Sequence, residues 1–238
     1  KLESPSQRFI EIKIGQDSSP PIYIAQQTLE SLSPYFCNAL KDNTFPEGKN
    51  GSMSFPEDEP DVWKELAHWI YYHRVTYGSN DDLELAVRCW TTADKYGIEA
   101  FQDAIMLTIL RSLDVAQCNE YLDLKVVQLV FERTVEKSLL RELFIDWIIL
   151  DSQGYTSLEG WLSDTLDNFE DYSALDFASL DGSGFYPAMM EKKLRFEREG
   201  RAALKWRHDR TGDNHRPGWE EFFFNKNVYS CKQDDGEE

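Results

Sequence analysis

The sequence predicts an α+β fold, in which a small sheet with a helical cluster is followed by an all-helical extension. The segments that have strand character all precede residue 60, and they alternate hydrophobic and polar side chains. From residue 60 onwards, hydrophobic residues recur at helical spacing. Because strands and helices form separate groups and do not alternate, we expect an α+β unit and not a chain of βαβ repeats.

Three short strands are expected. Residues 9–15 alternate hydrophobic and polar side chains and end at a glycine, which is typical of a strand. Residues 22–24 follow a turn-rich stretch and predict the second strand of a hairpin. Residues 53–55 predict a third strand, which leads into the acidic turn of residues 56–61.

Helices in the first half are indicated by their start signals. Ser33 can cap a helix that begins at Pro34, since proline suits the first helical position. Residues 80–82 place a cap and negative charge before a helix that ends at Gly97, and residues 99–113 predict the next one. Pro60 begins a further helix, whose predicted inward face holds Val62, Leu66, Trp69, Ile70 and His73.

Beyond residue 114 the chain is predicted to be helical. Residues 126–131 and 138–150 are hydrophobic segments, and Ser138 is the expected cap of the second one. Residues 181–184 predict a turn, residues 188–207 a long charged helix, and the end from Lys232 a disordered tail. Residues 151–180 are acidic and weakly helical, with the hydrophobic anchors Trp161, Leu162, Leu166 and Phe169.

The formal net charge is −18, and it is unevenly distributed. Residues 1–115 carry 10 basic and 18 acidic side chains, residues 116–190 carry 4 and 14, and residues 191–238 carry 11 and 11. Because nucleic acids and anionic membranes attract basic surfaces, neither is expected as a partner. The four cysteines form no paired motif and no hydrophobic run is long enough to span a membrane, so we expect reduced thiols in a cytoplasmic or nuclear protein.

Catalytic and metal-binding patterns were sought and not found. His68 and His73 are five residues apart, whereas two metal ligands on one helix face are four apart. His208, His215 and Cys231 match no known metal-ligand spacing. No nucleophile–histidine arrangement and no glycine-rich phosphate loop occurs. The sequence therefore predicts no catalytic, cofactor or metal site, and we expect a protein that is not an enzyme.

Five short motifs follow one another between residues 8 and 113. They are Leu29-x3-Ser33-Pro34-Tyr35-Phe36, Phe45-Pro46-Glu47-Gly48, Phe55-Pro56-Glu57-Asp58, Trp69-Ile70-Tyr71-Tyr72 and Ala93-Asp94-Lys95-Tyr96-Gly97-Ile98. In order and spacing they resemble the motifs of BTB/POZ domains. Residues 130–141 resemble the helical extension of filamentous-fungal BTB proteins, and residues 191–204 are similar to the charged helix that ends many of them.

The resemblance implies a BTB/POZ domain at residues 8–113, a helical extension at 114–180, a linker at 181–187, and a charged helix with a C-terminal tail at 188–238. It also implies a non-catalytic protein–protein interaction module that acts as a scaffold or adaptor for a protein partner. Two alternatives stay open. One is a substrate adaptor of a cullin-type ubiquitin ligase, and the other is a nucleic-acid-linked transcription regulator that uses the basic residues 192–216.

Candidate partner-binding residues follow from the same resemblance. Cullin-binding members carry a hydrophobic-x-acid signature before the A-D-K-Y segment, and here the matching Leu85 and Val87 are hydrophobic without the acid. Tyr71 and Tyr72 complete the candidate set. Ala25 and Gln26 replace the histidine and basic residue that often follow the second strand, so no basic pocket is expected. The long form of the family builds a swapped dimer from a helix and a strand that precede the first strand. Only eight residues precede the first strand here, so we do not expect that dimer. Self-association by another surface stays open.

Two features of the last 50 residues have more than one interpretation. Residues 192–216 hold nine basic and four acidic side chains, and we expect this segment to dock on the acidic residues 116–190 with the help of Leu194, Ala202 and Leu204. Nucleic-acid binding is the alternative. The aromatic group Trp219, Phe222, Phe223 and Phe224 is expected to close over the helical core, and a hydrophobic partner patch is the alternative.

Overall fold

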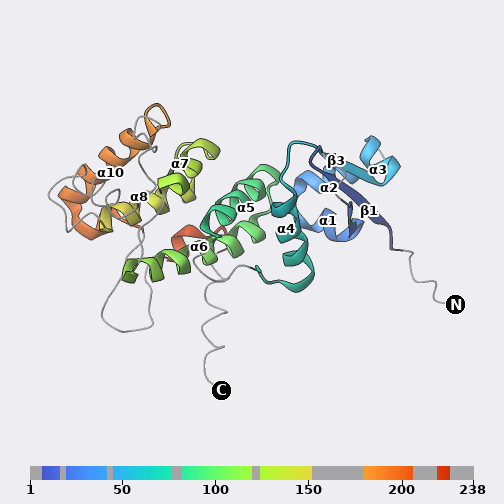
Figure 1. The fold of residues 1–238 in the computed structure, drawn as a ribbon, viewed down its shortest axis with the longest axis horizontal. Helices are drawn as coiled ribbons and strands as arrows, with labels where there is room; N and C mark the ends of the chain where they lie inside the picture. Colours follow the sequence, from blue (N-terminus) through green and yellow to red (C-terminus); the bar gives the residue numbers. More distant parts are fainter. Residues whose placement is uncertain are drawn as a thin grey trace, which may run out of the picture. The chain divides into compact units, whose positions relative to one another are not determined.

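The computed structural model describes residues 7–16, 20–41, 45–76, 82–119, 124–151, 180–205 and 219–225. In these ranges the chain forms one small sheet and many helices, which confirms the predicted mixture of a sheet with a mainly helical remainder (Figure 1). The chain divides into two compact units. Unit 1 comprises Lys1–Gly78 and Arg88–Ile105, and unit 2 comprises Ser79–Val87 and Met106–Glu238.

The sheet of unit 1 has three strands, β1 (Phe9–Ile14), β2 (Ile22–Ala25) and β3 (Ser52–Phe55), and β1 lies in the middle. Strand β1 pairs with β2 in antiparallel and with β3 in parallel orientation. All three strands and the hairpin are as predicted. Alternation along the strands turns one face of the sheet into the core, and this face carries Ile10, Ile12, Ile14, Ile24, Met53 and Phe55.

Two short helices follow β2, and they lie beside the strands in Figure 1. Helix α2 (Pro34–Leu40) begins as predicted, because the Ser33 hydroxyl accepts the N–H of Phe36 at 3.5 Å. It buries Phe36 and Leu40. Helix α1 (Gln26–Leu32) was not predicted, since it is a single short segment with one buried residue and no side-chain cap.

Helix α3 (Pro46–Asn50) is a second short helix that the sequence did not predict. It ends at Gly51, whose φ of +67° is readily adopted by glycine alone. The Gly51 N–H donates to Glu47 O at 2.9 Å and closes the last turn. Strand β3 starts directly after this glycine.

Helix α4 (Pro60–Tyr72) begins at its proline as predicted and buries Val62, Trp63, Leu66 and Ile70 in unit 1. It ends at His73, which adopts a left-handed conformation and is exposed. The prediction that His73 belongs to the inward face was therefore wrong, because the helix stops one residue earlier. Helix α5 (Leu83–Tyr96) starts behind Asp82, whose Oδ1 accepts the N–H of Leu85 at 2.9 Å, and it ends before Gly97.

Helix α6 (Glu99–Asn119) runs six residues beyond its predicted end. Helices α7 (Leu124–Arg133) and α8 (Leu139–Asp151) of unit 2 correspond to the two predicted hydrophobic segments. Ser138 caps α8 as expected, since its hydroxyl accepts the N–H of Arg141 at 3.3 Å. The indole N–H of Trp147 donates to Leu113 O at 3.2 Å, which fastens α8 to the unit 2 part of α6.

The charged helix α10 (Phe185–Glu199) begins three residues before its predicted start. Pro187 is tolerated because the first turn of a helix needs no N–H from that position. The helix ends at Gly200, with φ +62°, and not at Arg207 as predicted. A short 3₁₀ segment, η5 (Gly200–Ala203), follows it directly, and a second one, η6 (Trp219–Phe222), lies further along the chain.

Several predictions concern residues outside the described ranges. These are most of the acidic segment 151–180 with its anchors Trp161, Leu162, Leu166 and Phe169, the residues 206–216 of the basic segment, and the tail from Lys232. Among the helices that are described, none has the length and hydrophobicity needed to cross a membrane.

Candidate protein-interaction surface

Two of the sequence motifs meet at the side chain of Asp58 in unit 1. The Asp58 carboxylate accepts the indole N–H of Trp63 at 2.8 Å, the Lys95 ammonium at 2.7 Å and the Tyr96 hydroxyl at 2.6 Å. The carboxylate is almost fully buried. Three donors therefore compensate its desolvation, and they bind the loop before α4 to the end of α5.

An aromatic cluster surrounds this carboxylate. Phe55 stacks on Trp63 with 4.7 Å between ring centroids, and Tyr96 lies 5.2 Å from Phe55 and 5.8 Å from Phe36. Burial, together with the neighbouring Asp58 carboxylate, raises the pKa of the Tyr96 hydroxyl well above its ordinary value. These residues hold unit 1 together, because the polar groups of Asp58, Trp63 and Tyr96 face one another between packed aromatic rings.

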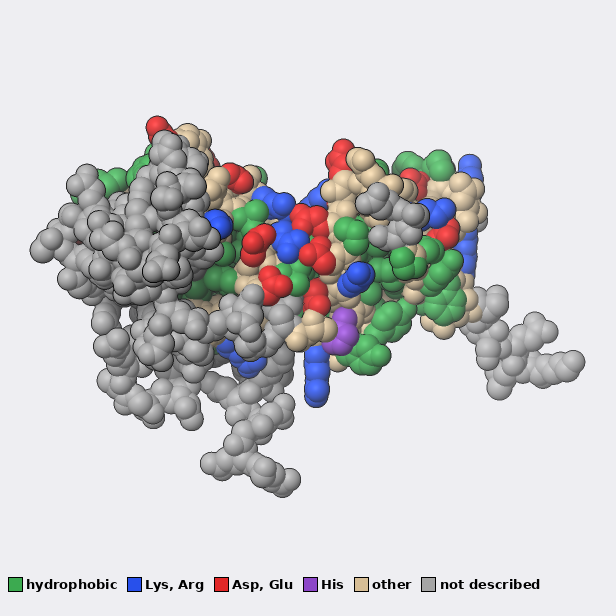
Figure 2. Space-filling model, in the orientation of Figure 1, with side chains coloured by type: hydrophobic (Ala, Val, Ile, Leu, Met, Phe, Trp, Pro, Cys, Tyr) green, Lys and Arg blue, Asp and Glu red, His purple; other side chains and the backbone are tan. Residues whose placement is uncertain are grey.

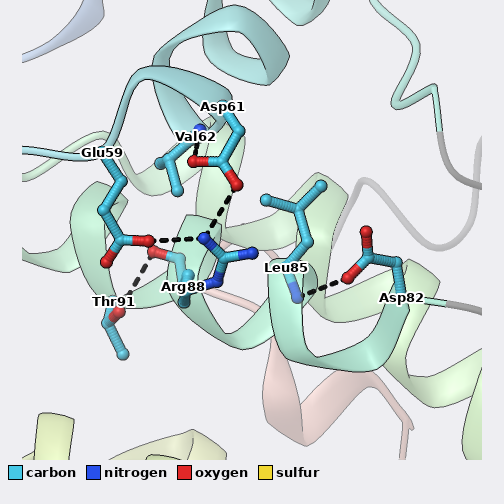
Figure 3. A network of polar contacts seen from close by, with 7 residues as sticks. All are labelled: Glu59, Asp61, Val62, Asp82, Leu85, Arg88 and Thr91. Carbon is cyan, nitrogen blue, oxygen red and sulfur yellow. Dashed lines mark hydrogen bonds and ion pairs between the residues drawn. The ribbon is translucent and has the colours of Figure 1, made fainter. Parts of the chain in front are cut away.

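An ion-pair cluster next to these contacts joins α5 to the start of α4 (Figure 3). The Arg88 guanidinium binds Glu59 Oε2 at 2.5 Å and Asp61 Oδ2 at 2.8 Å. Burial alone would lower the pKa of Arg88, but the bonds to the two carboxylates raise it above its ordinary value. Figure 3 shows Arg88 between the two acids, so this cluster is an internal ion-pair network.

The four candidate partner-binding residues do not share one environment. The exposed fraction is 8% for Leu85 and 0% for Val87, so both are buried. In contrast, it is 56% for Tyr71 and 66% for Tyr72, at the end of α4. Only the two tyrosines lie on the surface where a protein could contact them.

Two exposed aromatic residues of the sheet belong to the same region as Tyr71. The Tyr71 hydroxyl donates to the Tyr23 carbonyl oxygen of β2 at 2.8 Å. Tyr23 pairs with Glu11 and Ala25 pairs with Phe9, so Phe9 and Tyr23 are diagonal neighbours on the outer face of the sheet. Both are more than half exposed. We call Phe9, Tyr23, Tyr71 and Tyr72 the aromatic surface of unit 1, and Figure 2 shows hydrophobic side chains gathered on the visible face of this unit.

Phe9 and Tyr23 were missed at the sequence level, although a signal was present. In residues 9–14 the isoleucines occupy every second position, so Phe9 falls on the same face as Glu11 and Lys13. A phenylalanine on the polar face of a strand is the observation that could have identified it.

Tyr72 contacts a histidine of the same helix, α4. Its ring lies 4.7 Å from that of His68, and His68 Nδ1 is 2.9 Å from Arg74 O. This histidine therefore takes part in an aromatic and backbone contact. Within the described part of the chain, no three histidine, cysteine or acidic side chains gather in a way that could hold a metal ion.

The described part of the basic segment, residues 192–205, docks on α8, as expected. The Lys192 ammonium of α10 lies 2.8 Å from Asp146 Oδ1, Lys205 forms an ion pair with Glu142, and the Lys205 N–H donates to Asp146 Oδ2 at 2.7 Å. Leu204 is buried as predicted. The prediction that Leu194 and Ala202 pack was wrong, because both side chains are exposed and Ala203 takes the inward position.

The aromatic group at residues 219–224 closes the core of unit 2. Trp219, Phe222 and Phe223 are buried, and η6 contacts α8. Phe224 is exposed. The core-closure interpretation therefore describes three of the four residues.

No model of a known protein family matches the chain, and no curated protein matches it.

Proposed function

We propose that the chain is a non-catalytic protein–protein interaction module of the BTB/POZ type, which acts as a scaffold or adaptor. The observation that carries the proposal is the aromatic surface of unit 1. Tyrosine and phenylalanine are enriched where proteins bind proteins, because they bury a large area at a low cost in side-chain entropy. Here four of them are exposed on strands and a helix that are held by a buried core.

The arrangement of the motif residues also supports this proposal. The motif residues Phe36, Phe55, Asp58 and Tyr96 face one another around Trp63 in the interior of unit 1, so they stabilise this unit. A BTB-like scaffold, with motif residues in its core and a separate exposed surface for binding, fits this division. The acidic net charge favours a protein partner over a nucleic acid.

The test compares surface variants of the full chain in quantitative cross-linking and affinity capture from cell extract. The variants Tyr71→Glu and Tyr72→Glu place charge on the aromatic surface, and Val135→Glu adds the same charge at an exposed hydrophobic position of unit 2. We expect the amount of captured protein to fall at least tenfold for the same partners in both tyrosine variants, and to stay unchanged in Val135→Glu. Equal capture by all four proteins would contradict the proposal.

The cullin alternative is tested with a purified cullin N-terminal region in place of extract. Because Leu85 is buried, Leu85→Glu would perturb folding and is unsuited to this experiment. Tyr72→Glu is the informative variant. Retention of the cullin by the wild-type chain and its loss in Tyr72→Glu would support the adaptor form of the proposal, and no retention by the wild type would reject it.

A further inference from the structure

A cavity of about 360 Å³ lies between α8 and α10 in unit 2. Its wall combines charged and hydrophobic side chains from both helices, and we call it the α8–α10 cavity. Its lining includes Arg141 and Ile145 of α8, Gly184 before α10, and Ala188, Lys192 and Arg195 of α10. The volume is at the lower end of the ~300–1,000 Å³ range typical of small-molecule sites.

Arg141 is the buried cation of this cavity. Its guanidinium donates to Thr134 Oγ1 at 2.9 Å, to Phe131 O at 2.6 Å, to Thr134 O, and to Ser183 O at 3.4 Å. All four acceptors are uncharged. Among the described residues, no carboxylate lies within ion-pair distance of Arg141. Burial lowers the pKa of its guanidinium, and the more distant, exposed Glu136 offsets this only in part.

The Arg141 guanidinium has more N–H donors than there are acceptors bonded to it. Nε donates to Thr134 Oγ1, and the two N–H groups of Nη2 donate to Phe131 O and Thr134 O near the end of α7. Nη1 has only the long bond to Ser183 O. A guanidinium carries five N–H groups, so one hydrogen of Nη1 has no acceptor in the described part of the chain. Nη1 lies beside Gly184, where a Cβ would come within 3.3 Å of it. The spare donor is thus at the Gly184 side of the cavity.

The surrounding charges make this end of the cavity attractive to an anion. Arg195 lines the cavity, and its partner Glu199 is an exposed residue. Three carboxylates also belong to the wall. Glu136 and Glu191 are exposed and screened by water, and Glu142 is paired with Lys205. Gly184 is the N-cap of α10, whose first turn holds no acidic residue, so the helix dipole adds partial positive charge there.

The other wall of the cavity is hydrophobic, since Ile145, Pro187 and Ala188 line it. We propose that the α8–α10 cavity binds a small organic carboxylate, with its charged group on Arg141 and a short hydrocarbon body against Ile145 and Ala188. The carboxylate supplies an acceptor for the spare N–H of Nη1 and a negative charge directly at the guanidinium. This site belongs to unit 2 and is independent of the aromatic surface of unit 1.

The test is isothermal titration of the full chain with hexanoate, with uncharged hexanamide and with inorganic phosphate. We expect hexanoate to bind, and hexanamide and phosphate to bind at least tenfold more weakly. Equal binding of hexanoate and hexanamide would overturn the role of Arg141 in recognising the charge. Tighter binding of phosphate than of hexanoate would overturn the role of Ile145 and Ala188 in recognising a hydrocarbon body. Absence of hexanoate binding would overturn the proposal as a whole.

Variants locate the site. Ala188→Leu fills the cavity without touching the bonds of Arg141, and Arg195→Ala removes a lining charge. Arg198→Ala, on the same helix outside the cavity, is the matched control. We expect at least a tenfold loss of hexanoate affinity in Ala188→Leu, a smaller loss in Arg195→Ala and none in Arg198→Ala, with unchanged circular dichroism. Wild-type affinity in a folded Ala188→Leu protein would overturn the assignment.

Discussion

Lys192 of α10 and Asp146 of α8 form an ion pair of 2.8 Å in which the Asp146 side chain is completely buried. The second Asp146 oxygen accepts the backbone N–H of Lys205, so one carboxylate holds both α10 and the segment that follows it. Such a pair is costly to form, because both ions leave water, and it is more costly to break. The basic segment is therefore bound to its own chain through this contact.

Lys192→Ala is expected to lower the free energy of unfolding by about 3–5 kcal/mol, because it removes the Lys192 ammonium from a completely buried carboxylate. Urea denaturation followed by circular dichroism measures the change. The control is Glu199→Ala, which removes an exposed pair with Arg195 and is expected to cost only about 0.5 kcal/mol. Similar losses in the two variants would show that the Asp146 pair is not a main contact of unit 2.

Tyr96→Phe is expected to destabilise the chain by about 1.5–3 kcal/mol, since the buried Asp58 carboxylate loses one of its three donors. Thermal or urea unfolding provides the measurement. Tyr72→Phe removes a hydroxyl from an exposed ring and is expected to change stability by less than about 0.5 kcal/mol. An equal effect of both substitutions would contradict the assigned role of the Asp58 bond.

The raised pKa of Tyr96 predicts a loss of stability in alkaline solution. The folded protein holds the hydroxyl proton more tightly than the unfolded chain, whose tyrosines ionise near pH 10. The contribution of Tyr96 is thus fully present below pH 10 and is lost as the pH rises above that value. Unfolding free energies measured between pH 8.5 and 11 are expected to fall more steeply in the wild type than in Tyr96→Phe. Parallel curves would refute this linkage.

Phe222→Ala is expected to destabilise unit 2 by about 3–5 kcal/mol, because a fully buried ring is removed from the core. Phe224→Ala, two residues further on, removes an exposed ring and is expected to cost less than about 1 kcal/mol. Chemical denaturation of both variants checks the difference. A large effect at Phe224 with none at Phe222 would show that the aromatic group does not close the core as described.

Much of the fold was predictable because its signals are local. The alternation in residues 9–14 gives β1, and Ser33, Asp82 and Ser138 each cap the helix that the sequence placed behind them. Helices α1 and α3 were missed because a segment of five to seven residues shows hardly two turns of periodicity. The early end of α10 was missed although Gly200 stood in the sequence, because the hydrophobic and basic pattern continues past it.

The candidate surface was harder to predict, because it depends on contacts between distant residues. Tyr71 was identified from its motif, but its neighbour Tyr23 is 48 residues away and meets it only after the sheet and α4 have packed. The burial of Leu85 and Val87 likewise depends on tertiary packing. For the basic segment the sequence indicated docking by charge, yet it could not select Ala203 over Ala202 as the inward residue.

The double attachment at Asp146 has a consequence for synthesis on the ribosome. Unit 1 has all of its residues once Ile105 has emerged, whereas the contacts of the buried Asp146 carboxylate with Lys192 and Lys205 form only after those later residues have emerged. At a translation rate of about 5–20 residues per second, the face of α8 that later contacts α10 stays exposed for several seconds. The nascent chain therefore passes through a stage in which unit 1 is complete and unit 2 still offers a hydrophobic face to chaperones.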